Sequence, residues 1–116
     1  MELSSFEKLE VWKRSCRQAL AIYEALKETK DFGLKNQMER AAVSVPSNIA
    51  EGAERNTTKD FIRYLSIALG SNAELRTQLY LAKQLGIIRE ASGLIHEAKE
   101  ISAMLQSLIN TLRQKM

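Results

Sequence analysis

The 116-residue sequence has one cysteine, one proline, one histidine and few aromatic side chains. A lone cysteine, Cys16, excludes a disulfide within the chain and fits a reducing compartment. One proline and five glycines are too few for the many reversals of an all-β fold. No apolar run approaches the ~20 residues of a membrane-spanning helix, and the first residues do not resemble a signal peptide. We therefore expect a cytoplasmic protein without membrane contact.

Groups that could perform chemistry are also scarce. His96 lies between charged residues, which indicates an exposed helix position, and Cys16 has the spacing of a core residue. A nucleophile pair of Cys16 and His96 is the alternative. The Glu-x-x-His motifs of di-metal bundles are absent, as are zinc spacings, phosphate loops and nucleotide fingerprints. We expect no enzyme activity, metal, cofactor or small-molecule substrate.

What the sequence does contain is the composition of one folded domain, residues 1–116. Hydrophobic residues make up 45% and charged residues 27%, which is ordinary for a globular protein and too apolar for disorder. The net charge of +3 is a mild basic excess. Most nucleic-acid-binding proteins are more basic or carry more clustered charge.

Apolar residues at steps of three and four predict four helices, at about 5–29, 34–54, 58–85 and 90–114. Ser4 or Ser5 is the expected cap of the first helix and Thr57 that of the third. Gly33 should end the first helix, and Pro46 should kink the second rather than stop it. The predicted core stripe of the first helix consists of Leu9, Trp12, Cys16, Ala19, Tyr23 and Leu26.

Short connections between these helices favour an antiparallel up-down-up-down four-helix bundle. Further apolar residues lie outside the predicted core stripes, and exposed patches of this kind often mark interfaces. We therefore expect a homo-oligomer. These outer residues are Val11, Ile22, Ile62, Leu69, Tyr80, Ile95 and Ile109.

Polar side chains at or beside the core-facing positions of the second and third helices form a second pattern. Buried polar groups must pair, because an unsatisfied one costs about 1–3 kcal/mol. The predicted network comprises Ser44, Asn48, Glu51, Ser71, Asn72 and Glu74, with Arg40 and Arg55 as charge partners. It fixes helix register or an oligomer interface, or it contacts a ligand or nucleic acid. Gly70 should let the same two helices pack closely.

Basic side chains suggest where a nucleic acid would bind. Lys13, Arg14 and Arg17 cluster on the first helix, and Lys59 and Arg63 on the third. Acidic residues interrupt both groups, so a solvated surface of mixed charge is the alternative. A ring of several copies would multiply the groups and raise the avidity.

Two segments in the order of a known family carry a resemblance. Residues 37–52, QMERAAVSVPSNIAEG, and 60–75, DFIRYLSIALGSNAEL, resemble the signatures of the four-helix bundle proteins encoded by 23S rRNA intervening sequences. Residues 6–12, FEKLEVW, are similar to the opening of that family, although Phe32-Gly33 replaces its usual Phe-Pro pair. The resemblance implies an antiparallel bundle assembled as a homopentameric ring.

The family is also distantly similar to accessory proteins of diversity-generating retroelements, which bind nucleic acid and a reverse transcriptase. Our first hypothesis is therefore a homo-oligomeric, non-enzymatic protein that contacts RNA or an RNA-containing complex. The alternative is a protein–protein adaptor or structural module without nucleic-acid contact.

Overall fold

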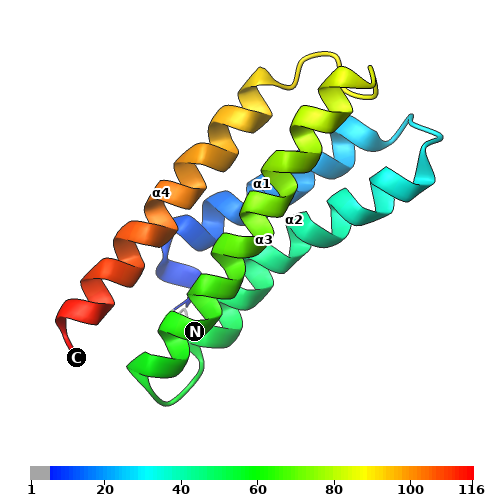
Figure 1. The fold of residues 1–116 in the computed structure, drawn as a ribbon. Helices are drawn as coiled ribbons and strands as arrows, with labels where there is room; N and C mark the ends of the chain where they lie inside the picture. The colour runs from blue at the N-terminus through cyan, green and yellow to red at the C-terminus, as the bar shows by residue number, and fades with distance from the viewer. Residues whose placement is uncertain (1–5) are drawn as a thin grey trace.

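A computed structural model describes residues 6–116, and all regular elements in that range are helices (Figure 1). A 3-10 turn, η1 (Phe6–Lys8), precedes α1 (Glu10–Leu26), α2 (Phe32–Ala53), α3 (Thr58–Gln84) and α4 (Ser92–Gln114). The prediction of an all-α fold with four helices is confirmed. The predicted caps at Ser4 and Ser5 lie outside the described residues.

The connection between α1 and α2 differs from the prediction. α1 ends at Leu26, and α2 already begins at Phe32, where the Asp31 carboxylate accepts a hydrogen bond from the Leu34 amide at 3.2 Å. Gly33 therefore lies in the first turn of α2 and does not end α1. Gly86, with φ of 75°, is the described residue with positive φ, and it follows α3, where the helix must stop.

Two other local predictions concern Thr57 and Pro46. The Thr57 hydroxyl accepts a hydrogen bond from the Asp60 amide at 3.1 Å, so this predicted cap is confirmed. Pro46 lies inside α2, which continues to Ala53. The proline therefore does not stop the helix, as predicted, and the kink expected there stays a prediction.

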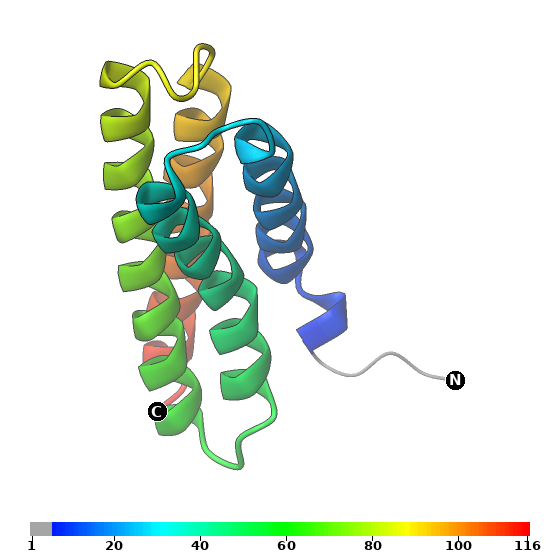
Figure 2. The ribbon, with the colours of Figure 1, turned by 90° about the vertical axis from the view of Figure 1, so that its right-hand side faces the viewer.

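The four helices pack as a bundle in which each helix touches two neighbours. α2 packs against α1 and α3, and α4 packs against α3 and α1, whereas the described helices make no close backbone contact along the diagonals α1–α3 and α2–α4. The chain reverses its direction at each connection (Figure 2). The most extensive contact between two helices is that of α2 with α3.

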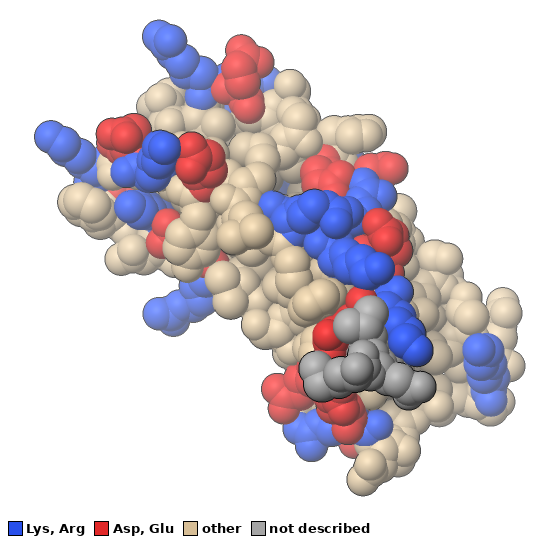
Figure 3. Space-filling model, turned by 180° about the vertical axis from the view of Figure 1, so that it is seen from behind, with Lys and Arg blue, Asp and Glu red and all other residues tan. Residues whose placement is uncertain are grey.

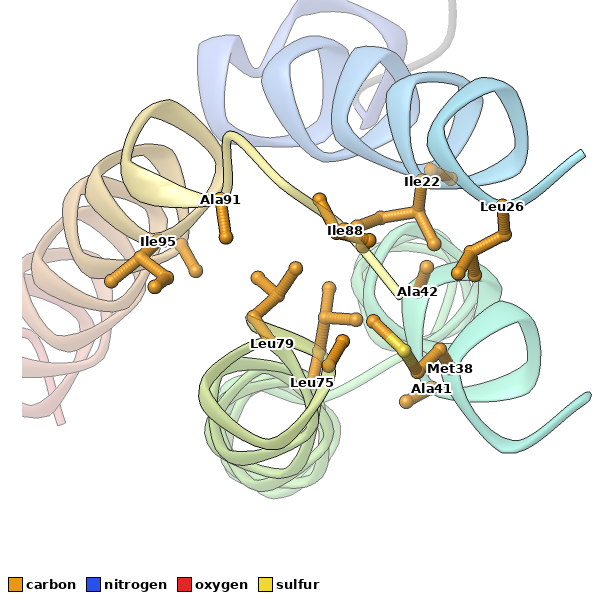
Figure 4. Close-up of a cluster of buried hydrophobic side chains, with 13 residues drawn as sticks. Ile22, Leu26, Met38, Ala41, Ala42, Leu75, Leu79, Ile88, Ala91 and Ile95 are labelled. Carbon is orange, nitrogen blue, oxygen red and sulfur yellow. The ribbon is translucent and has the colours of Figure 1, made fainter. Parts of the chain in front are cut away.

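The core consists of two clusters stacked along the bundle. The cluster nearest the α3–α4 connection receives side chains from all four helices and from the connection itself, including Ile22, Met38, Leu79, Ile88 and Ile95 (Figure 4). The second cluster lies towards the α2–α3 connection. Fully burying one such aliphatic side chain stabilises the fold by about 1.5–3 kcal/mol.

The buried face of α1 is rotated by one residue from the predicted stripe. Ile22 and Leu26 are fully buried, whereas Tyr23 is 46% exposed. The helix carries two interleaved apolar sets, both at helical spacing, and contact with α2 and α4 selects between them. The full buried set of α1 is Val11, Ser15, Gln18, Ala19, Ile22 and Leu26.

The apolar residues that we assigned to an outer surface, on α1 and on α4, also need correction. Four of them lie in the core instead, namely Val11, Ile22, Ile95 and Ile109. Ile62 and Leu69 are half-buried, and Tyr80 is exposed. Most of these residues therefore cannot form an oligomer interface, and an interface would have to use other exposed side chains.

Close packing between α2 and α3 occurs at Gly52 and not at Gly70. A Cβ on Gly52 would lie 2.7 Å from Tyr64 Cβ and 3.2 Å from the Phe61 carbonyl oxygen. A Cβ on Gly70 would meet nothing within 4 Å. The prediction for Gly70 is therefore wrong, because this residue faces outward.

Candidate functional site

Asn72 lies at the centre of the bundle and joins three helices. Its Nδ2 donates to the Ala98 carbonyl oxygen at 2.7 Å and to Ser102 Oγ at 2.8 Å, both on α4. Its Oδ1 accepts from Gln18 Nε2 of α1 at 3.0 Å. Asn72 has no exposed surface, so the predicted link to α2 is corrected to a link with α1 and α4.

A second polar cluster joins α2 to α3 near the surface. The hydroxyls of Ser44 and Ser71 share a hydrogen bond of 2.8 Å. Asn48 Nδ2 donates to both the carbonyl oxygen and the hydroxyl of Ser44, each at 2.9 Å. The structure therefore brings together three of the predicted residues, and it separates them from Asn72.

Arg55 forms a third cluster at the end of α2. Its guanidinium donates to Glu51 at 3.1 Å and to the Tyr64 hydroxyl at 2.5 Å. The guanidinium of Arg63 lies 4.5 Å from the centre of the Tyr64 ring, and that of Arg55 lies 4.9 Å from it. The hydrogen bond to Tyr64 is the main reason why the pKa of Arg55 lies above its ordinary value.

Arg40 and Glu74, the remaining predicted members, face solvent on opposite sides of a groove between α2 and α3. The groove has a volume of about 600 Å³. Neither Arg40 nor Glu74 has an ion-pair partner within 4 Å in the part of the chain that the structure describes. The lining residues are Asn36, Gln37, Arg40, Glu74, Thr77, Gln78 and Leu81.

The five basic candidates fall into two groups on helices that lie diagonally across the bundle. Lys13, Arg14 and Arg17 belong to α1, and Lys59 and Arg63 belong to the first turns of α3. Seen from the side of α1, blue side chains gather near the middle of the molecule with red ones among them (Figure 3). One protomer therefore does not bring the five residues into a single patch.

Carboxylates already neutralise part of this charge. Arg14 makes a two-pronged ion pair with Glu97 of α4, with Nε–Oε2 at 2.9 Å and Nη2–Oε1 at 2.5 Å. Arg17 lies 3.4 Å from Glu10, and Arg63 lies 3.9 Å from Asp60. Among these five candidates, Lys13 and Lys59 have no carboxylate within 4 Å in the described residues.

The Arg14–Glu97 ion pair joins α1 to α4. Its two side chains are 26% and 32% exposed, so the pair is partly buried between the helices. Hydrogen bonding from Arg14 lowers the pKa of the Glu97 carboxyl, and the reciprocal contact raises the pKa of Arg14. Arg14 is therefore the least available of the five cations for a phosphate group.

The reactive groups do not form a catalytic arrangement in the described chain. Cys16 is half-buried and burial raises the pKa of its thiol, which keeps it protonated and a poor nucleophile at neutral pH. No hydrogen bond joins Cys16 to the exposed His96 within residues 6–116. The same residues contain no cluster of three or more His, Cys, Asp or Glu side chains suited to a metal ion.

None of the helices in the described region is both long and apolar enough to cross a bilayer.

Sequence reasoning missed four partners in these clusters, one of them Tyr64, which accepts a hydrogen bond from Arg55. Gln18 and Ser102 hold Asn72, and Glu97 holds Arg14. The helical spacing of Ser15, Gln18 and Ile22 was an available signal for Gln18. Nothing in the spacing of α4 indicates which of its acidic residues meets α1, because that choice depends on how the two helices pack.

The fold and these clusters define an all-α four-helix bundle whose polar residues serve mainly to join helices. Residues 7–107 match the family described as 23S rRNA-intervening sequence protein. The chain belongs to this family, as the resemblance of the two central segments implied.

A solved structure is also similar to this chain. It is that of a protein of unknown function from the S23 ribosomal protein family of Bacteroides thetaiotaomicron. The two chains are 30% identical and superpose with a TM-score of 0.80, over 85% of this chain and 97% of the other. No curated protein matches this chain.

Proposed function

We propose that this protein is a non-enzymatic, homo-oligomeric bundle that contacts RNA, or an RNA-containing complex, through its phosphates. The protomer is an antiparallel up-down-up-down bundle, and the family resemblance implies a pentameric ring. The observation that carries the RNA contact is the row of cations on the outer side of α1, where Lys13 has no carboxylate partner among the described residues and Arg17 is 64% exposed. Repetition around a ring multiplies this charge.

Phosphate contact dominates in this proposal because the exposed aromatic side chains of the described residues, Tyr23, Phe32 and Tyr80, lie on three different helices and do not form a platform for base stacking. Tyr23 and Tyr80 are half-exposed on α1 and α3, and Arg55 and Arg63 already occupy the ring of Tyr64. Binding is therefore independent of the RNA sequence. The logarithm of the association constant falls linearly with the logarithm of the salt concentration.

The test is fluorescence anisotropy with a mixed-sequence RNA over a range of salt concentrations. The triple variant Lys13→Glu, Arg17→Glu, Arg63→Glu should lose most of the affinity and flatten the salt dependence, while the oligomer stays intact. The matched control is Lys83→Glu, Arg89→Glu, Lys99→Glu, which changes the net charge equally at exposed positions elsewhere. Equal losses in both variants, or no loss in the first, would contradict an RNA contact at these residues.

A protein–protein adaptor is the second candidate function. The ion pairs of Arg14, Arg17 and Arg63 favour it, because a cation with a carboxylate nearby contributes less to phosphate binding. In that case the protein remains oligomeric and binds no RNA even at low salt.

A further inference from the structure

Gly70 occupies an exposed position in the middle of α3, where a glycine destabilises the helix. Glycine in a helix interior costs about 1 kcal/mol relative to alanine. A Cβ at this position would meet no atom within 4 Å, so no contact within the protomer explains the missing side chain. A surface that approaches α3 from outside does explain it, because glycine permits the closest approach of two backbones.

Gly70 lies near exposed apolar side chains. The Ser44–Ser71 hydrogen bond fixes α2 beside α3 at this level. Ile67 lies one turn before Gly70 on α3, and Val43, the residue before Ser44, lies on the outer side of α2. Both side chains are 42% exposed, and Leu81 further along α3 is 50% exposed. We call this surface, Arg40, Val43, Ile67, Gly70, Glu74 and Leu81, the α2–α3 face.

The groove at one end of this face contains polar groups without partners. The Gln78 side chain lines the groove, is 6% exposed, and its Oε1 accepts no hydrogen bond. Arg40 and Glu74 present opposite charges on its two sides. An unsatisfied buried acceptor and two unpaired charges are what a docking partner with donors and matching charges would satisfy.

A second unpartnered surface lies on the outer side of α1. Leu20 is 71% exposed, the highest value of any large apolar side chain inside a helix, and Tyr23 beside it is 46% exposed. Glu24 and Lys27 continue this stripe at helical spacing; they form an ion pair with each other at 2.9 Å and remain largely exposed. The stripe therefore presents one exposed apolar side chain, Leu20, followed by the anion Glu24 and the cation Lys27.

We propose that the α1 stripe of one copy packs on the α2–α3 face of the next copy. Leu20 then lies over Gly70 beside Ile67, with Glu24 near Arg40 and Lys27 near Glu74. Two different surfaces in contact make a head-to-tail interface, and such interfaces close into rings when the rotation permits. This inference rests on the proposed homo-oligomer and names the two surfaces that hold it together.

The competing arrangement is a two-fold dimer in which the α2–α3 face meets itself, pairing Arg40 with Glu74 of the other copy. That arrangement leaves Leu20 and Tyr23 of both copies in solvent. The head-to-tail contact covers both surfaces at once, and it keeps Lys13, two turns before Leu20, free for RNA, with Arg17 at the edge of the contact.

Cysteine cross-linking distinguishes these arrangements. In a Cys16→Ser background, Leu20→Cys and Ile67→Cys chains are mixed and treated with a short bis-maleimide. Cross-linked dimers should form in the mixture and in neither variant alone, and a chain with both cysteines should give a ladder of multimers. Replacing Leu20→Cys by Lys99→Cys, an exposed site on α4, is the matched control and should give no cross-link.

Gly70→Leu provides an independent measurement, since the new side chain has open space within the protomer. It should reduce self-association at least ten-fold without loss of helix content by circular dichroism. An oligomeric protein that gives no cross-link and tolerates Gly70→Leu would overturn the assignment of these surfaces alone. Cross-linking of Ile67→Cys by itself would favour the two-fold dimer, and a monomeric wild-type protein would overturn the proposed oligomer as well.

Discussion

Gln18 donates a hydrogen bond to Asn72 across the diagonal of the bundle, with 3.0 Å between Nε2 and Oδ1. α1 and α3 make no close backbone contact, so these two amides connect helices that would otherwise touch only through the apolar core. The Asn72 amide group then continues to α4. A single buried residue of α3 is thereby hydrogen-bonded to both α1 and α4.

Replacing Asn72 by leucine should destabilise the protomer by about 1–3 kcal/mol, because the Gln18 amide loses its buried partner. The double variant Gln18→Leu, Asn72→Leu should cost less than the sum of the two single variants, since it leaves fewer polar groups unpaired. Urea denaturation of the four proteins completes the cycle. Strict additivity would show that the Gln18–Asn72 bond contributes nothing of its own.

Gly52→Ala should destabilise the protein by about 1–3 kcal/mol, the usual cost of overpacking. The new methyl group would lie 2.7 Å from Tyr64 Cβ, and two packed helices must separate to admit it. Gly93→Ala is the matched control, because a Cβ there meets nothing within 4 Å. Thermal unfolding should show a lower midpoint for the first variant and an unchanged or slightly higher midpoint for the second.

The Arg14–Glu97 pair should make stability depend on pH. The folded-state pKa of Glu97 lies below its ordinary value, so its stabilisation is complete at neutral pH and is lost as the pH falls through the ordinary carboxyl pKa towards the folded one. Glu97→Gln should cost about 0.5–1 kcal/mol at neutral pH, given the partial exposure of the pair.

The measurement is the free energy of unfolding of wild type and Glu97→Gln between neutral and acidic pH. The difference between them should shrink as the pH falls. A difference that is constant over this range would mean that the charge of Glu97 does not stabilise the fold. Lys99→Glu on the exposed side of α4 controls for a general change in charge.

Most of the fold could be predicted from the sequence, and the reasons are visible in α3. Its apolar stripe from Leu65 to Ala82 has a single helical period, and the buried residues of α3 follow it. α1 carries two sets of residues at helical spacing one residue apart, so spacing alone could not decide between Tyr23 and Ile22 as core residues. Only packing against α2 and α4 selects the second set.

The polar clusters were less predictable. Helical spacing indicates on which side of a helix a residue lies, but it does not indicate which residue of another helix it contacts. Asn72 was placed on the core side of α3 correctly, but its partners on α1 and α4 depend on the tertiary arrangement. The same holds for the two glycines, since the sequence does not reveal that Gly52 faces α3 while Gly70 faces solvent. For Asn72 and for both glycines, the sequence did not show which helix, or whether any helix, the residue faces.

Self-association is the claim on which both the RNA contact and the α1 contact with the α2–α3 face depend. Light scattering coupled to size-exclusion chromatography, at tens of micromolar protein, measures it directly. We predict a mass that is a multiple of the 13.1 kDa chain, and the family resemblance implies a five-fold one. A mass of one chain at that concentration would contradict it.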